Sequence, residues 1–416
     1  MSVALKPSTD PKSLGFDPER LINLDRWMQR YVDEGKFPGS SILVARHGEI
    51  AHLATAGYCS IERQQPFELD TITRIYSMTK PITSVAIMML VEQGHFHLDA
   101  PIDRFLPEFS DCHALRSDAT SLDQCEPCPT PTIHQLLVHT SGLTYSFNDN
   151  ILAKGYQRDK IDTHSETEDL AHMVKRIAAL PLLFSPGDRW EYSVAIDVLS
   201  RLVEVVSGQS LDVFLQENIL DPLGMTETAF SIAPDKLDRF ADCYVFDAEP
   251  ENKDQTSGSL RLMDDARSSS FATGKVRMLS GGGGLVSTLS DYFQFAEMVR
   301  QGGSLNGQRL LSPRTVSFMQ RNHLPGDMAS MGPKSWAEMP MDGVGFGLGG
   351  SVVLDPGRMR APGSVGDFSW GGMASTIFWI DPVEQLTVIF FTQLVPSSAY
   401  PNRPELKALV HAALVG

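Results

Sequence analysis

Short apolar runs typical of β-strands occur near both ends of the chain, whereas the middle of the chain is mostly helical or irregular in pattern. Near the N-terminus, residues 40–45 and 49–54 are separated by Arg46-His47-Gly48, which predicts a β-hairpin. Further strand-like runs lie near the C-terminus, at residues 346–354, 363–370, 375–380 and 386–394. Because strands must pair, this distribution predicts one sheet built from both ends of the chain.

Predicted helices supply the layers around this sheet. Apolar residues at helical spacing predict helices at residues 18–34, 133–139, 169–180, 195–207, 211–220, 290–301 and 405–414. Another helix, from Ser77 to Gly94, is apolar nearly all round, which indicates that it is buried. The segment 231–275 is rich in Asp and Ser and has no clear period, so we expect a long loop there.

The fold class predicted from this pattern is α/β, or α+β by layer. We expect an antiparallel sheet flanked by helices, with a helix-rich domain inserted into it. A chain of 416 residues is long enough for two such units. We assign residues 1–90 and 275–416 to the sheet domain and residues 91–274 to the inserted domain, with an active site at the interface between them.

The charge balance bears on possible partners. The chain has 35 Lys and Arg against 51 Asp and Glu, and its net charge of −16 would repel nucleic acids and anionic membrane surfaces. Residues 1–17 lack the apolar run of a signal peptide, and the apolar stretches elsewhere are too short to span a bilayer. We therefore expect a cytoplasmic protein with a small-molecule partner; the pattern does not specify an oligomeric state.

Cysteine usage gives no sign of a disulfide framework or a metal site. The five cysteines are an odd number, which in a cytoplasmic chain favours reduced thiols. Cys125 and Cys128 form a CxxC pair near Cys112 and His113, but no second CxxC or HxxxH completes a zinc site. We expect neither a metal nor another cofactor.

Chemistry is most strongly indicated where the long apolar helix begins. In Ser77-Met78-Thr79-Lys80, the i, i+3 spacing places a hydroxyl and an amine on one face of the helix. Serine is a weak nucleophile and needs a base within hydrogen-bond reach. A lysine in apolar surroundings tends to lose its charge, and a neutral amine can act as that base. Although an isolated SxxK pattern also fits an ordinary helix start, this one opens a helix that is predicted to be buried.

Further segments follow in chain order. They are LLVHTSGL at 136–143, PGDRWEYSV at 186–194, SGGGGLVST at 280–288 and SWGGM at 369–373. With the SxxK motif, they resemble the serine β-lactamase and penicillin-binding-protein superfamily, and within it the family VIII carboxylesterases with SxxK, YxV and WGG motifs. The resemblance extends over roughly residues 15 to 415, and its specificity comes from the order of several motifs.

The resemblance implies roles for individual residues. Ser77 would be the nucleophile, with Lys80 and Tyr192 sharing the role of base. The WGG segment would line the substrate site, through Trp370, Gly371, Gly372 and Met373. Within it, the Met373 N–H would join the Ser77 N–H in an oxyanion hole. We also expect Tyr145, which follows the HTSGL segment, at a pocket wall.

Two departures from the lactamase pattern favour esters as substrates. Lactamases commonly carry an asparagine two residues after the catalytic tyrosine, and this chain has Val194 there. Trp370 stands where lactamases and peptidases have the lysine of a lysine-threonine-glycine motif, so a positive charge that would hold a substrate carboxylate is missing. Neutral acyl esters become the expected substrates.

Other catalytic designs fit less well, and several functions remain open. No GxSxG pentapeptide indicates a Ser-His-Asp hydrolase, and no HExxH motif indicates a metallohydrolase. A serine carboxylesterase acting through a Ser77 acyl-enzyme, with weak β-lactamase side activity, is the first prediction. The alternatives are an acyltransferase that uses the same acyl-enzyme, a β-lactamase or D-amino-acid peptidase, and a non-catalytic member of the superfamily.

Overall fold

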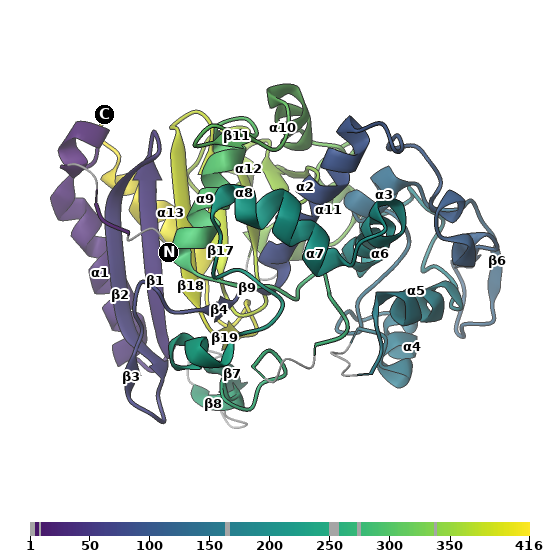
Figure 1. The fold of residues 1–416 in the computed structure, drawn as a ribbon, viewed down its shortest axis with the longest axis horizontal. Helices are drawn as coiled ribbons and strands as arrows, with labels where there is room; N and C mark the ends of the chain where they lie inside the picture. The colour runs from purple at the N-terminus through teal and green to yellow at the C-terminus, as the bar shows by residue number, and fades with distance from the viewer. Residues whose placement is uncertain (1–4, 8–9, 163–166, 249–257, 273–275, 337–338) are drawn as a thin grey trace.

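The computed structural model describes residues 5–7, 10–162, 167–248, 258–272, 276–336 and 339–416. Its centre is an eight-stranded sheet in which every neighbouring pair of strands is antiparallel. From one edge to the other, the strands are β14 (Val344–Phe346), β15 (Ser351–Val353), β16 (Phe368–Gly371), β17 (Ile377–Asp381), β18 (Leu386–Thr392), β1 (Gly39–Arg46), β2 (Glu49–Ser60) and β3 (Gln65–Pro66). Because β18 pairs with β1, both ends of the chain build one sheet, as predicted (Figure 1).

Both faces of the sheet are covered by helices. Alternate residues of β1 belong to different hydrophobic cores. Ile42 and Val44 pack into the core on one face of the sheet, and Leu43 and Ala45 pack into the core on the other face. The first face is covered by α1 (Pro18–Asp33) and α13 (Asn402–Ala413), and the second by α2 (Thr79–Glu92) and α9 (Leu289–Arg300). Burial on both faces explains why the strands are continuous apolar runs in the sequence.

Most of the other helices lie in the chain between α2 and α9. They are α3 (Ile133–Leu137), α4 (Ile151–Asp159), α5 (Leu170–Ala178), α6 (Ala195–Ser207), α7 (Leu211–Leu215), the π-helix η5 (Gln216–Leu220) and α8 (Asp221–Leu223). In Figure 1, α3 to α6 gather at the opposite end of the molecule from α1. The helix α6 contacts α2, α3, α5 and α7, so it links this group to the helix that begins near Ser77. The division into two domains at residues 90 and 275 stays a prediction.

Shorter elements complete the fold. The short helices and helical turns are η1 (Pro11–Leu14), η2 (Tyr76–Met78), η3 (Ile102–Arg104), η4 (Pro107–Phe109), α10 (Pro313–Met319), α11 (Met328–Met331) and α12 (Pro356–Met359). The short paired strands are β4 (Thr73–Arg74) with β9 (Val286–Ser287), β5 (His113–Leu115) with β6 (Cys125–Pro127), β10 (Ser304–Leu305) with β11 (Gln308–Arg309), and β12 (Ser335–Trp336) with β13 (Met339–Pro340). The pair β4–β9 brings the residues before Ser77 next to the residues after the glycine-rich segment.

The prediction of a long loop over residues 231–275 is wrong. This segment contains η6 (Pro234–Arg239) and the hairpin of β7 (Cys243–Ala248) and β8 (Gly258–Asp264). Strand β7 also pairs with β19 (Leu394–Val395), which lies far away in the sequence. The fully buried Arg74 forms an ion pair with Asp264 at 2.6 Å. Long-range pairing therefore holds a hairpin whose polar composition does not indicate strands.

A stability prediction follows from the core between the sheet and α1. Phe390 of β18 is fully buried, and its ring centroid lies 5.7 Å from that of Trp27 and 5.9 Å from that of Phe37. The Phe390→Ala substitution leaves a cavity and is expected to lower the free energy of unfolding by about 3–5 kcal/mol. Urea denaturation measures this. Val383→Ala is the control, because Val383 is 66% exposed and its truncation should change stability by less than about 0.5 kcal/mol.

Two further observations concern the expected compartment and redox state. Among the described residues, no helix combines the length and the apolar character needed to cross a bilayer. The five cysteines are free thiols in the structure, and Cys59 and Cys243 are buried.

Candidate active site

Ser77 lies in η2, directly before α2. The preceding residue, Tyr76, has a left-handed backbone with φ of 43°, a conformation that costs energy for a residue other than glycine. Ser77 is partly exposed, while Lys80, one turn later, is only 1% exposed. The Lys80 Nζ atom lies 3.1 Å from Ser77 Oγ. The structure thus brings together the two residues of the SxxK motif, with the hydroxyl toward solvent and the amine beneath it.

Three oxygen atoms surround the Lys80 amine. Besides Ser77 Oγ, Nζ lies 2.9 Å from the Tyr145 hydroxyl and 2.6 Å from the Gly282 carbonyl oxygen. An ammonium group has three N–H donors, so these acceptors satisfy it fully. A neutral amine would use two N–H groups for Tyr145 and Gly282, which leaves its lone pair facing Ser77. The geometry therefore accommodates both protonation states.

Tyr145, which was expected at a pocket wall, is in direct contact with Lys80. The side chain is 8% exposed, and its hydroxyl contacts the Lys80 amine directly. Burial, followed by the electrostatic effect of the nearby Asp197, raises the pKa of Tyr145 well above its usual value. The residue therefore stays a neutral phenol at ordinary pH. Phe147, which is 58% exposed, stacks on the Tyr145 ring with centroids 4.8 Å apart.

Tyr192 also lies beside Lys80, but through its ring. The Lys80 Nζ atom is 4.6 Å from the ring centroid of Tyr192, and the Tyr192 hydroxyl accepts a hydrogen bond from Trp370 Nε1 at 3.2 Å. The Tyr192 backbone is fixed by Asn148, whose amide donates both to the Tyr192 carbonyl and to the Glu191 carboxylate. The structure thus groups Tyr192 with Ser77, Lys80 and Trp370; its role as a base stays a prediction.

The WGG segment approaches the residues before the nucleophile closely. A Cβ atom on Gly372 would lie 2.4 Å from the Ile75 carbonyl oxygen, so only glycine fits there. Gly371 is similarly tight, because its Cβ would meet Arg403 Nη2 at 2.6 Å. Met373 follows at the end of β16 and is 39% exposed. This packing brings Gly372 against Ile75, two residues before Ser77. The oxyanion hole of the Ser77 and Met373 N–H groups stays a prediction.

The glycine-rich segment 280–284 packs between α2 and α6. A Cβ atom on Gly281 would lie 2.0 Å from Ser200 Oγ, and one on Gly282 would lie 2.5 Å from Asp197 Oδ2. The Thr83 hydroxyl donates to the Gly281 carbonyl at 2.9 Å. Glycine is therefore needed here for close packing, and this packing brings the Gly282 carbonyl to Lys80.

Sequence reasoning missed two buried residues at this site. The first, His139, belongs to the HTSGL segment. Its ring centroid lies 4.9 Å from that of Tyr192, and its Nδ1 lies 3.0 Å from Ser193 Oγ. Burial, together with the Lys80 charge, lowers the pKa of His139 well below its usual value, so the ring is neutral. The second, Asp197, carries no motif signal, because its partners lie more than 80 residues away.

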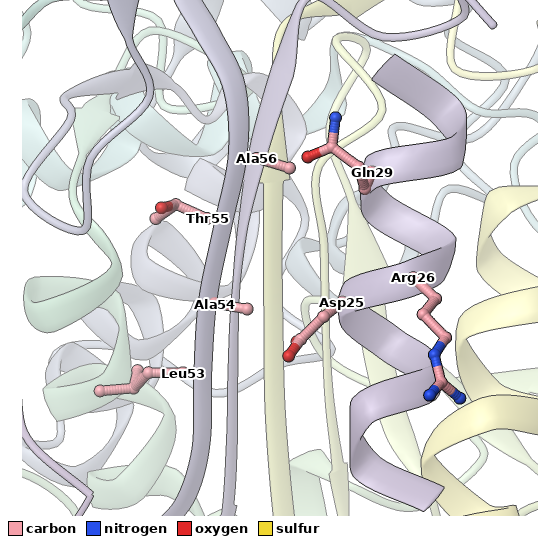
Figure 2. Close-up of a pocket in the computed structure, with 7 residues that line it drawn as sticks. All are labelled: Asp25, Arg26, Gln29, Leu53, Ala54, Thr55 and Ala56. Atoms are coloured by element: carbon pink, nitrogen blue, oxygen red, sulfur yellow. The ribbon is translucent and has the colours of Figure 1, made fainter. Parts of the chain in front are cut away.

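A separate groove of about 470 Å³ lies between α1 and β2 (Figure 2). Asp25, Arg26 and Gln29 line it from α1, and residues 53–56 line it from β2. In Figure 2, Ala54 and Ala56 point toward the helix, while Leu53 and Thr55 point away from it. The lining contains none of the residues predicted for catalysis.

The bond between Trp370 and Tyr192 leads to a prediction. Trp370→Phe removes the N–H donor but keeps an aromatic ring, so the Tyr192 hydroxyl loses one neutral hydrogen bond. Because such a bond contributes about 0.5–1.5 kcal/mol, we expect kcat/KM for a short ester to fall about 3- to 10-fold. The control is Trp379→Phe, the same change in the core under the opposite face of the sheet, which should leave kcat/KM unchanged. Equal activity of Trp370→Phe and the unmodified enzyme would contradict a role for this bond.

Comparisons with known proteins agree with the geometry. The chain matches the beta-lactamase family over residues 24–412. It is 32% identical to the esterase EstB of Burkholderia gladioli, over 92% of this chain and 93% of EstB. Among solved structures, it superposes on EstCE1, described as a hydrolase with promiscuous acyltransferase activity, with a TM-score of 0.76, 27% identity and coverage of 98% and 99% of the two chains. It also superposes on unliganded simvastatin synthase (LovD) of Aspergillus terreus, with a TM-score of 0.78, 25% identity and coverage of 96% and 98%.

These similarities extend along nearly the whole chain, so they concern the complete arrangement of sheet and helices rather than one motif. The resemblance to the serine β-lactamase superfamily, inferred from the SxxK, HTSGL and WGG segments, is confirmed. Membership of the family VIII carboxylesterases stays a prediction. The chain belongs to the beta-lactamase family and has the fold of its serine hydrolases.

Proposed function

We propose that this protein is a carboxylesterase that hydrolyses small neutral esters through an acyl-enzyme on Ser77. The observation that carries the proposal is the position of the buried Lys80 amine, 3.1 Å from the partly exposed Ser77 hydroxyl and held from behind by Tyr145 and Gly282. A hydroxyl open to substrate with a fixed amine behind it is the arrangement that an activated serine needs. The similarity to EstB supports an ester as substrate.

In the first step, the neutral Lys80 amine accepts the Ser77 proton while Oγ attacks the ester carbonyl carbon. The negative charge moves to the carbonyl oxygen, where the backbone N–H groups of Ser77 and Met373 stabilise it. The tight fit of Gly372 against Ile75 supports this assignment, since it fixes the distance between the two segments. The carbon–oxygen bond to the alcohol then breaks, and the alkoxide takes up a proton as it leaves.

Tyr192 faces the same amine and is the second group proposed to move protons. The Trp370 N–H stabilises negative charge on the Tyr192 oxygen, as does a protonated Lys80 next to the ring. Tyr192 would donate a proton to the leaving alkoxide and later take one from the water that cleaves the acyl-enzyme. Which of Lys80 and Tyr192 is the principal base is left to the kinetics of their variants.

The surroundings favour neutral substrates over β-lactams. Val194 is fully buried at the start of α6 and offers no amide to a substrate. Trp370 uses its one N–H for Tyr192, and its side chain carries no positive charge of the kind that the lysine supplies at this position in lactamases. The exposed Phe147 stacks on Tyr145 and provides apolar surface beside the reacting groups, and we propose that the exposed Met373 adds to it. We propose that β-lactam hydrolysis is at most a side activity.

Acyl transfer is the second candidate function. It is favoured by the similarity to simvastatin synthase and to EstCE1, whose description includes acyltransferase activity. The same acyl-enzyme gives transfer whenever an alcohol reaches the acyl group in place of water. Hydrolysis and transfer therefore differ in the acceptor and share every residue proposed here.

The test is to incubate the purified protein with p-nitrophenyl butyrate, with and without a primary alcohol, and separately with a chromogenic cephalosporin. We expect hydrolysis of the ester to exceed cephalosporin turnover by at least about 10²-fold. A butyrate ester of the added alcohol as main product would select the acyltransferase. Faster cephalosporin turnover would overturn the esterase proposal, and turnover of neither substrate would support a non-catalytic protein.

A further inference from the structure

Asp197 is a buried carboxylate at the site that the proposed mechanism does not use. It lies in the first turn of α6, where the helix dipole favours a negative charge, and its side chain is 1% exposed. No ion pair joins it to a residue in the described ranges. A buried carboxylate is costly unless hydrogen bonds compensate it, so the groups that bind Asp197 indicate its function.

Among the described residues, both hydrogen bonds to this carboxylate come from the glycine-rich segment. The Ser280 hydroxyl donates to Asp197 Oδ1 at 2.6 Å, and the Gly282 N–H donates to the same oxygen at 3.0 Å. Oδ2 faces Gly282 so closely that a Cβ atom there would lie 2.5 Å away. One side chain on α6 therefore fixes the position of Gly282.

Gly282 passes this constraint on to the catalytic amine. Its carbonyl oxygen accepts the 2.6 Å hydrogen bond from Lys80 Nζ, the shortest of the three contacts of that atom. A continuous chain of hydrogen bonds thus runs from Asp197 through Gly282 and Lys80 to Ser77 Oγ. Lys80 Nζ has two partners besides Ser77, the Tyr145 hydroxyl and the Gly282 carbonyl, and these two orient the nitrogen lone pair toward Ser77 Oγ. If Gly282 shifts, one of these two orienting bonds is lost.

Asp197 acts at a distance from the reacting atoms. Neither of its oxygens is hydrogen-bonded to Ser77 or Lys80 in the structure, so it is not placed to take the Ser77 proton itself. Burial raises the pKa of the Asp197 carboxyl, while the Lys80 charge and the bonds from Ser280 and Gly282 lower it. Whether the carboxyl is protonated or not, its Oδ1 atom can accept the hydrogen bonds from the glycine-rich segment.

We propose that Asp197 is a positioning residue that holds the Gly282 carbonyl against Lys80 and thereby directs the amine at Ser77. The inference rests on the acyl-enzyme mechanism proposed above. It assigns to the glycine-rich segment a role in catalysis, as the support of the base, in addition to its role in packing.

The test uses two substitutions that separate the acceptor from the charge. Asp197→Ala removes both hydrogen bonds to the loop, whereas Asp197→Asn keeps a carbonyl oxygen that can accept them. Ser280→Ala is an intermediate variant, because it removes one of the two bonds and leaves the bond from the Gly282 N–H in place. Each variant is reacted with an alkyl fluorophosphonate, in which the Ser77 oxygen bonds to phosphorus, fluoride leaves and the base takes the serine proton.

Asp197→Ala should lower the rate constant of phosphonylation at saturating reagent by about 30- to 300-fold. The reason is that a Lys80 amine that no longer points at Ser77 removes its proton less efficiently. The half-saturating concentration should stay within about threefold, because Asp197 does not touch the reagent. Asp197→Asn and Ser280→Ala should stay within about fivefold of the unmodified rate constant.

Two results would overturn the inference. One is phosphonylation of Asp197→Ala at the unmodified rate; the other is a loss of more than about 50-fold in a folded Asp197→Asn, which would mean that the charge, and not the hydrogen-bond acceptor, is required. Where the Ala variant does not fold, the Asn variant can still overturn the inference, because a loss of that size would show that the charge is required. Failure of the proposed function would give a different result: the unmodified protein itself would form no adduct on Ser77. That result would overturn both the proposed function and this inference.

Discussion

Replacing Ser77 with alanine is expected to lower kcat/KM for p-nitrophenyl butyrate by at least about 10⁴-fold, the scale seen when a nucleophilic serine is removed. Ser77 Oγ is the hydroxyl next to the Lys80 amine, at 3.1 Å, and alanine leaves the amine with nothing to deprotonate. The folded structure should persist, because Ser77 is partly exposed and the substitution removes a single atom. Initial rates with the ester measure the effect.

A serine on the same helix provides the control for this prediction. Ser84 of α2 is fully buried, and its hydroxyl has no hydrogen-bond partner among the described residues. Ser84→Ala makes the same chemical change about two turns further along the helix and should leave kcat/KM within about twofold. A Ser77→Ala protein that kept more than about one per cent of the activity would contradict the assignment of the nucleophile.

Removing the amine should have the next largest effect. Lys80→Met keeps a flexible side chain of similar length but has no group that can accept a proton. We expect kcat/KM to fall about 10³- to 10⁴-fold, which corresponds to about 4–5.5 kcal/mol of transition-state stabilisation. The loss should appear mainly in the rate of acyl-enzyme formation, measured by rapid mixing and quenching followed by intact mass.

The charge of Lys80 can be separated from its function as a base. Lys80→Arg keeps a positive charge but cannot be deprotonated, because the guanidinium group stays charged in proteins. If Lys80 accepts the Ser77 proton, the Arg variant should be as inactive as the Met variant. Circular dichroism of both variants checks that the buried site still folds. A folded Arg variant with more than about a tenth of the unmodified activity would show that charge alone is enough.

The sequence predicts the sheet well because its evidence is local. Ile42 to Ala45 form a continuous apolar run because both faces of β1 are buried, and such a run indicates a central strand without knowledge of its partners. The hairpin β7–β8 was missed for the opposite reason. Its strands are stabilised by pairing with β19 and by the ion pair of Asp264 with Arg74, and neither partner is near in the sequence.

The candidate site divides in the same way. Ser77 and Lys80 are three residues apart on one helix, so their proximity can be read from spacing. Tyr145 was expected near the pocket, but nothing local shows that its hydroxyl meets the Lys80 amine. Asp197 has no recognisable motif, since its bonds reach residues 83 and 85 positions later in the chain. Contacts of this kind depend on the packing of α2, α6 and the glycine-rich segment.

The most direct test of the central claim is to locate the acyl group. The protein is mixed with p-nitrophenyl butyrate, quenched with acid during the first turnovers and digested, and the peptides are sequenced by mass spectrometry. We predict one butyryl group per chain, on Ser77, present during turnover and lost when the ester is exhausted. Butyryl on another residue, or ester hydrolysis without any covalent adduct under conditions that trap the intermediate, would contradict the account.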